Sequence, residues 1–266
     1  MEHFGEEIEH LLHFLASNDL ETGIASWHLT NYLVFLFIAV AVMLVITLVA
    51  RTKAGLIPKG RFYNLIELLV EFVRNDVAVA NIGPEGTKYF PFLGTVFFFI
   101  LINNIIGTLP GGKPGTGTMG VTVALALVAF VMFNAAGMQK KGVGGYIKGI
   151  VPHGVPGVLW PVIWVIEVIS LFVRPFTLSI RLFANMYAGH IVLGIFSILT
   201  SIAVEQIIQG IEGSGVANIA IGGIGMLAWM LLLTALYVLE IGVAILQAYI
   251  FTLLTTVYIS LAVAEH

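Results

Sequence analysis

The chain has 266 residues, of which 59% are apolar and only 10% are charged, and its mean hydropathy is +1.01. Soluble domains have about 45–50% apolar and about 25% charged residues, so this composition excludes a water-soluble globule. The net charge of -3 argues against a basic nucleic-acid-binding surface. The absence of cysteine excludes disulfides and thiolate chemistry. We expect an all-α membrane protein, because a bilayer-spanning helix needs about 20 apolar residues.

The first 28 residues are acidic and are expected to lie outside the membrane. Residues 3–16 place apolar side chains at helical spacing opposite glutamates, which predicts a short amphipathic surface helix. The start carries neither the basic region of a signal peptide nor the arginine-rich bias of a transit peptide. This favours the inner membrane of a bacterium over the membrane of an organelle.

Positive charges set the expected topology. Four of them follow the first predicted span and none precedes it, which places the N-terminus outside and residues 51–89 in the cytoplasm. Within that loop, residues 61–82 alternate apolar and charged side chains at helical period, which predicts an interfacial helix. Lysines return the chain to the cytoplasm after the third span. The first three spans are predicted at residues 29–50, 90–110 and 121–138.

Two apolar stretches, residues 160–211 and 216–264, follow and are separated by a glycine-containing turn at 212–215. A helix of about 50 residues would be roughly 75 Å long, whereas the hydrocarbon core is about 30 Å thick. Each stretch therefore either breaks into two short spans, near Arg174 and near Glu240, or forms one long, bent and strongly tilted helix. Hydropathy favours neither alternative.

Charged side chains inside these stretches are candidates for a functional site, because each costs about 2.5–3.5 kcal/mol on insertion scales. At about 100° per residue, a polar stripe lies within roughly 40° of Arg181, and Pro175 is expected to bend the helix near its middle. The alternatives are a snorkelling Arg181 and an ion network at head-group level. The stripe consists of Glu167, Ser170, Arg174, Thr177, Arg181 and Asn185.

His190 lies nine residues after Arg181 and so points to the opposite face of the helix. Histidine titrates near neutral pH, so His190 is a candidate proton carrier, although a neighbouring carbonyl could equally satisfy it. Glu240 lies nearly as far from the turn as His190 does, and Gln247 lies nearly as far as Arg181. An antiparallel hairpin would therefore bring both pairs level, with His190 as the partner expected for Glu240.

The segment RLFANMYAGH, residues 181–190, closely resembles subunit a of the F-type ATP synthase. The resemblance extends to ILINNIIGTLP, to MQKKGVGGYIKG and to the C-terminal LQAYIFTLLTTVYISLAVAEH. It implies a stator subunit with two proton half-channels, which faces a ring of c subunits and is attached to the peripheral stalk of b subunits. It also favours five membrane-embedded helices, with the last two long and tilted and the C-terminus in the cytoplasm.

The resemblance also implies residue roles. Arg181 matches the essential arginine that faces the ring, and Glu167 matches an acidic residue of the cytoplasmic path. Asn185 and Gln247 match the amide neighbours of that arginine, and Asn104 matches the asparagine of the second span. His190 and Glu240 match a pair that occurs in the reverse order in other members. Gly107 is a departure, because some members carry an aspartate there. Protons are expected to enter by Asn104, His190 and Glu240 and to leave along Glu167, Ser170 and Thr177.

Nucleotide chemistry is expected to reside in other subunits, because the chain has no GxxxxGK[ST] phosphate-binding loop. No metal or cofactor is expected, and the chain is not expected to be an enzyme by itself. His190 favours protons over sodium ions as the transported species. The competing interpretations are a self-contained proton-coupled transporter, which would show inverted repeats, and a purely structural scaffold.

Overall fold

The computed structural model describes residues 31–52, 60–109, 112–149, 159–209 and 216–264. The predicted helix at residues 3–16 and the turn at 212–215 lie outside the described residues. All regular structure in the described residues is helical, so the prediction of an all-α membrane protein is confirmed. Five helices are long and apolar enough to cross a membrane, as expected from the sequence: Tyr32–Arg51, Gly86–Gly107, Met119–Ile147, Trp160–Glu205 and Gly222–Val263.

The first half of the chain forms two apolar helices that flank an amphipathic one. Helix α2 (Asn31–Thr52) ends at the predicted cytoplasmic loop. The amphipathic segment is helical throughout but changes its hydrogen bonding in an eight-residue π-helix, η1 (Phe72–Val79), between α3 (Arg61–Glu71) and α4 (Ala80–Ile82). Helix α5 (Gly86–Gly107) then runs back beside α2 and η1 and ends earlier than the predicted residue 110.

Helix α6 (Met119–Lys148) follows a single 3-10 turn, η2 (Gly115–Gly117). It continues beyond residue 138, where the sequence analysis ends the third span. Its helical geometry is interrupted at Gly142, where φ is 72°, a value that favours glycine. The lysines at 140 and 141 thus lie within the helix, and the kink comes directly after them.

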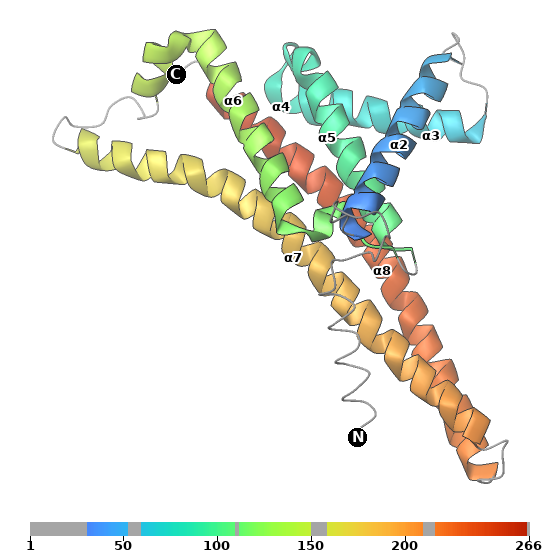
Figure 1. The fold of residues 1–266 in the computed structure, drawn as a ribbon. Helices are drawn as coiled ribbons and strands as arrows, with labels where there is room; N and C mark the ends of the chain where they lie inside the picture. The colour runs from blue at the N-terminus through green and yellow to red at the C-terminus, as the bar shows by residue number, and fades with distance from the viewer. Residues whose placement is uncertain (1–30, 53–59, 110–111, 150–158, 210–215, 265–266) are drawn as a thin grey trace, which may run out of the picture.

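Each long apolar stretch is one helix, which resolves the alternative left open by hydropathy. Helix α7 (Trp160–Gln209) continues through Pro175, and α8 (Val216–Val263) continues through Glu240. Figure 1 shows α7 bent along its length, as a proline within a helix leads one to expect. The break of each stretch into two short spans is therefore ruled out.

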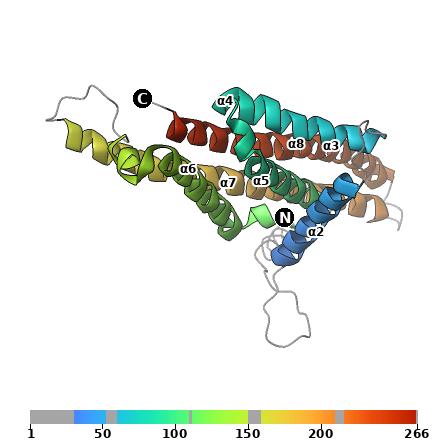
Figure 2. The same cartoon turned by 90° about the horizontal axis from the view of Figure 1, so that it is seen from above.

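The arrangement of α7 and α8 positions the polar residues. The second half of α7 and the first half of α8 lie side by side as a two-helix arm, and the other halves diverge (Figure 1). Helix α6 packs against both where they diverge, and α5 packs against α8. Viewed from above, the segment from α3 to α4 runs alongside the C-terminal half of α8 (Figure 2). The apolar core lies at this junction, centred on Leu93, Phe97, Phe133, Leu182 and Phe251.

Candidate functional site

Glu240 is buried between α7 and α8, with only 5% of its surface exposed. Its carboxylate lies against the backbone of Gly189, where a Cβ atom would overlap both carboxylate oxygens. Glycine at position 189 leaves room for this acidic side chain, and a larger residue there would require the carboxylate to move. We call this contact the α7–α8 seam and define it by Asn185, Gly189, Glu240 and Gln247.

His190 directly follows Gly189 and is half-buried at the same level. Its Nε2 atom is buried and has no hydrogen-bond partner in the part of the chain that the structure describes, and the same holds for Oε1 of Glu240. The structure thus brings His190 level with Glu240 but does not join them by a hydrogen bond or an ion pair within the described residues. Both groups keep a free hydrogen-bonding atom in an apolar setting, where a water molecule or a proton carrier can satisfy them.

A cavity of about 190 Å³ adjoins Glu240 and Gly189. Asn185 and Glu240 supply its polar side chains, and the rest of its wall is aliphatic or glycine. Since a water molecule occupies about 30 Å³ in the liquid, the cavity can hold several. The seam therefore has room for several water molecules beside the Glu240 carboxylate.

Asn185 and Gln247 extend the seam by about one turn. The side-chain amide of Asn185 donates a hydrogen bond to Oε1 of Gln247 at 3.4 Å, near the upper limit for such a bond. Gln247 is buried, and its Nε2 atom has no partner among the described residues. An unused amide donor, Nε2 of Gln247, thus lies in the seam next to Asn185, which follows Arg181 by four residues on α7.

Asn104 approaches the seam from α5. Its side-chain nitrogen donates to the carbonyl of Ala244 at 3.4 Å, and its side-chain oxygen accepts a 2.6 Å hydrogen bond from the hydroxyl of Thr116. Both side chains are fully buried. Ala244 lies one turn after Glu240 on α8, so Asn104 reaches the same stretch of the helix as the seam.

Thr116 was missed by the sequence analysis. It lies in the turn between α5 and α6, which glycine and proline mark only as a loop. Gly107 belongs to the same contact, because a Cβ there would overlap the ring of Pro114. This explains why an aspartate cannot occupy position 107 in this arrangement.

Lys113, also in the turn, is buried with its ammonium 5.4 Å from the ring centre of Tyr32, and burial lowers the pKa of this ammonium.

Arg181 lies on the exposed surface of α7 and has no ion pair with another described residue. The exposed residues around it are apolar or small, and we call this surface the Arg181 edge. No acidic side chain belongs to it. The edge comprises Phe176, Thr177, Ile180, Arg181, Ala184 and Ala188.

The polar stripe of α7 runs toward the N-terminal end of the helix. Glu167, Ser170 and Arg174 are half-buried and Thr177 is exposed, so none of them belongs to the core. The guanidinium of Arg174 lies 5.3 Å from the ring centre of Tyr258 on α8, within the range of a cation–π contact. The Thr177 hydroxyl is 3.0 Å from the carbonyls of both Val173 and Arg174, in the turn that contains Pro175.

The described residues contain no group of three or more histidine, aspartate or glutamate side chains that could hold a metal ion. The polar atoms instead form two neighbouring sets on α7, because Asn185 and Gly189 lie only about 40° and about 80° around the helix from Arg181. One set lies in the seam and is buried within the chain. The other follows the Arg181 edge and is open to a neighbour. This arrangement can deliver a proton to one side of a fixed positive charge and receive it on the other.

Comparison with known proteins identifies the family. The family model described as "ATP synthase A chain" matches residues 33–260. A protein of Myxococcus xanthus named ATP synthase subunit a is 38% identical over 99% of this chain and 79% of its own length. The relative of the same name in Cereibacter sphaeroides ATCC 17025 is 38% identical over 93% of this chain and 86% of its own length. The one in Chlorobium phaeobacteroides is 40% identical over 89% of this chain and 66% of its own length. In Anaeromyxobacter sp. Fw109-5 the match spans only 55% of the relative.

The matches cover both the α7–α8 seam and the Arg181 edge, and the family model alone spans most of the chain. The family expected from the RLFANMYAGH segment is therefore confirmed, and the chain belongs to the ATP synthase A chain family.

Proposed function

We propose that this chain carries protons past Arg181 to and from a rotating ring of c subunits. Its family makes it a membrane subunit of an ATP synthase, as the sequence predicts. In the proposed role the chain is a stator, and the nucleotide chemistry is performed by other subunits of the complex. The peripheral stalk of b subunits holds the stator in place while the ring turns.

The observation that carries the proposal is the exposed Arg181 on an apolar helix. A guanidinium cannot be discharged at physiological pH, and a charge in the hydrocarbon region needs a partner. Within the described residues none faces it. A carboxylate on each c subunit fits this requirement. Arg181 would attract this carboxylate and open its side chain, and the positive charge would prevent a proton from passing directly between the half-channels.

The shape of the Arg181 edge supports a helical partner. Ala184 and Ala188 are exposed and lie one and two turns from Arg181. Small side chains allow membrane helices to approach closely. A helix of the ring could therefore pass within reach of the guanidinium as the ring turns.

The two half-channels are assigned to opposite sides of this charge. Protons enter from the outside by Asn104, His190 and Glu240. This route is supported by the buried atoms of His190 and Glu240 that lack a hydrogen-bond partner among the described residues, and by the cavity beside Glu240. They leave on the cytoplasmic side along Glu167, Ser170 and Thr177. Each proton moved releases about 2.3 kcal/mol per 100 mV, so several are needed for one ATP.

The proposed location is the inner membrane of a bacterium, with the N-terminus outside. Arg51 and Arg61 at the end of α2 and the start of α3, and Lys140 and Lys141 near the end of α6, fit a cytoplasmic face by the positive-inside rule. The C-terminal end of α8 then lies on the cytoplasmic side as well. Labelling of single cysteines at these ends in intact cells tests this topology.

ATP-driven acidification of vesicles that contain the complete complex tests the function. We expect Arg181→Ala to abolish pumping, because nothing then separates the half-channels or opens the ring carboxylate. His190→Ala and Glu240→Ala should slow pumping without abolishing it. Lys141→Gln, which removes a positive charge on α6, is the matched control and should pump normally. An uncoupler should collapse the signal, and omission of sodium should leave it unchanged.

Wild-type pumping by all three variants would overturn the proposal. Assembly of each complex is checked on native gels, so that loss of the subunit is distinguished from loss of the proton path. Pumping that requires sodium would show that the path carries sodium ions instead. Transport by this chain alone, without other subunits, would favour the self-contained transporter.

A further inference from the structure

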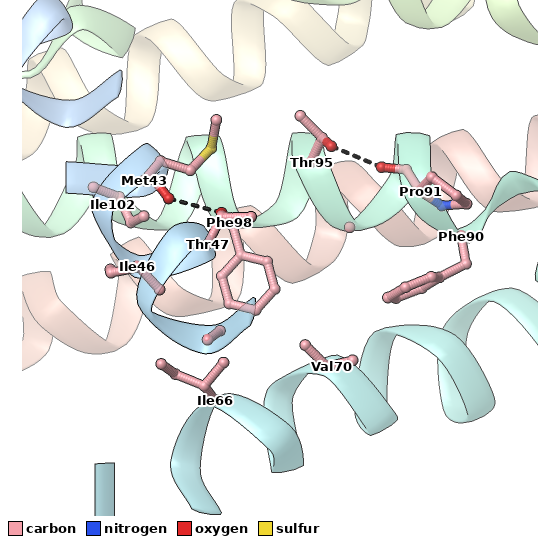
Figure 3. Close-up of a pocket in the computed structure, with 12 residues that line it drawn as sticks. Met43, Ile46, Thr47, Ile66, Val70, Phe90, Pro91, Thr95, Phe98 and Ile102 are labelled. Carbon is pink, nitrogen blue, oxygen red and sulfur yellow. Dashed lines mark hydrogen bonds between the residues drawn. The ribbon is translucent and has the colours of Figure 1, made fainter. Parts of the chain in front are cut away.

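We propose that a groove between α2, α3 and α5 binds one acyl chain of an anionic phospholipid, whose phosphate is held by Arg51 and Arg61. The groove has a volume of about 240 Å³ and is separate from the seam and from the Arg181 edge. Figure 3 shows side chains from all three helices around it. Those that shape it include Met43, Ile46, Ile66, Val70, Gly94 and Phe98.

The lining of the groove suits a hydrocarbon chain. Its two hydroxyl groups, on Thr47 and Thr95, donate to the carbonyls of Met43 and Pro91 one turn earlier, at 2.8 and 2.7 Å (Figure 3). Their hydrogen-bonding capacity as donors is therefore used within their own helices. The remaining lining side chains are aliphatic or aromatic. A polar ligand would find no free side-chain donor here, whereas an acyl chain gives up no hydrogen bond by entering.

Positive charge lies at one end of the groove. The hydroxyl of Tyr63 donates to the carbonyl of Val49, which holds the start of α3 against the end of α2. Arg51 directly follows Ala50, a lining residue, and Arg61 begins α3. Both guanidinium groups are exposed, and neither forms an ion pair with another described residue.

Arginine binds phosphate through paired hydrogen bonds. Basic residues at the cytoplasmic end of a membrane helix also attract anionic lipids. The two arginines and the groove therefore match the two parts of one molecule, a phosphate at the surface and an acyl chain below it. The charge complementarity selects an anionic phospholipid over a zwitterionic one.

Photolabelling of the complete complex tests the site. The complex is reconstituted in vesicles of phosphatidylcholine that contain a trace of phosphatidylglycerol with a diazirine on one acyl chain. After irradiation, mass spectrometry quantifies adducts on the peptides of α2, α3 and α5. We expect adducts on groove residues, and we expect the same diazirine on phosphatidylcholine to label them far less.

Matched variants separate the groove from the general lipid surface. Ala50→Phe fills the groove and should remove most of this labelling, whereas Ala41→Phe makes the same change on the opposite face of α2 and should not. Arg51→Gln with Arg61→Gln should reduce labelling by phosphatidylglycerol about tenfold or more, because each basic residue adds to binding. Lys141→Gln should leave it unchanged.

Equal labelling by the two lipids, or labelling unaffected by Ala50→Phe, would overturn the proposal. Loss of another subunit in Ala50→Phe with lipid labelling intact would mean that a protein covers this face, which also overturns it. Proton pumping is recorded in parallel. The lipid groove and the proton path share helix α5 but no residue, so each can fail while the other stands.

Discussion

The Arg181 edge and the α7–α8 seam both include residues of α7, but the ionisable side chain of the edge is exposed and that of the seam is buried. At the edge, Arg181 is exposed among apolar and small residues, with no acidic neighbour among the described residues. In the seam, Glu240 is buried and the chain itself makes room for it at Gly189. In the proposed function another molecule covers the edge, whereas helices of the chain itself enclose the Glu240 carboxylate in the seam.

The largest effect on the seam is expected from Gly189→Val. The added carbon atoms would overlap the Glu240 carboxylate, and either that side chain or the helix contact must move. We expect pumping to fall about tenfold or more, as expected when overpacking displaces an acidic group by an ångström or more. The same vesicle acidification assay measures this.

A double-mutant cycle isolates this contact. In a Glu240→Ala background the carboxylate is absent, so Gly189→Val should cost little beyond Glu240→Ala alone. Full additivity of the two substitutions would show that Gly189 acts on something other than Glu240, and the close contact would then have no functional consequence.

A smaller effect is expected from Thr116→Val. The variant removes the hydroxyl that donates to Asn104 and leaves a buried acceptor unsatisfied, at a cost of about 1–3 kcal/mol. If this raises the free-energy barrier to proton transfer by only about 1 kcal/mol, pumping falls roughly fivefold. Thr116→Ser keeps the donor and should pump at the wild-type rate. A Thr116→Val complex that pumps normally would show that the turn does not affect the proton path.

The smallest effect is expected from Asn185→Ala. Its hydrogen bond to Gln247 is 3.4 Å long, and such a bond contributes little. We expect pumping to fall by no more than about twofold, because a net contribution near 0.5 kcal/mol corresponds to that change. A loss as large as that of Gly189→Val would mean that the amide has a direct role in proton transfer.

Much of the fold could be predicted from the sequence, because hydropathy and charge act locally. The apolar runs lie in the helices of the structure, and the amphipathic segment after Arg61 is helical as expected. Hydropathy alone did not decide whether Pro175 ends a helix. The structure has α7 continuous there, because a proline removes one hydrogen bond while the flanking turns keep theirs.

The site was predicted in part, because helix periodicity and an antiparallel hairpin place His190 near the level of Glu240. The contacts that shape the site could not be predicted in the same way. Gly189 matters only because Glu240 lies against it, and Thr116 matters only because the turn folds back onto Asn104. Such contacts join residues far apart in sequence, and a glycine or threonine carries no local signal of them.

Photo-cross-linking from the Arg181 edge tests the central claim most directly. The chain has no cysteine, so Ala184→Cys gives this subunit a single attachment point for a benzophenone maleimide beside Arg181. The control is Val131→Cys on the exposed surface of α6. We predict an adduct with the c subunit from position 184 and none from position 131. An edge that cross-links only to lipid, or no more to the c subunit than the control does, would contradict the account.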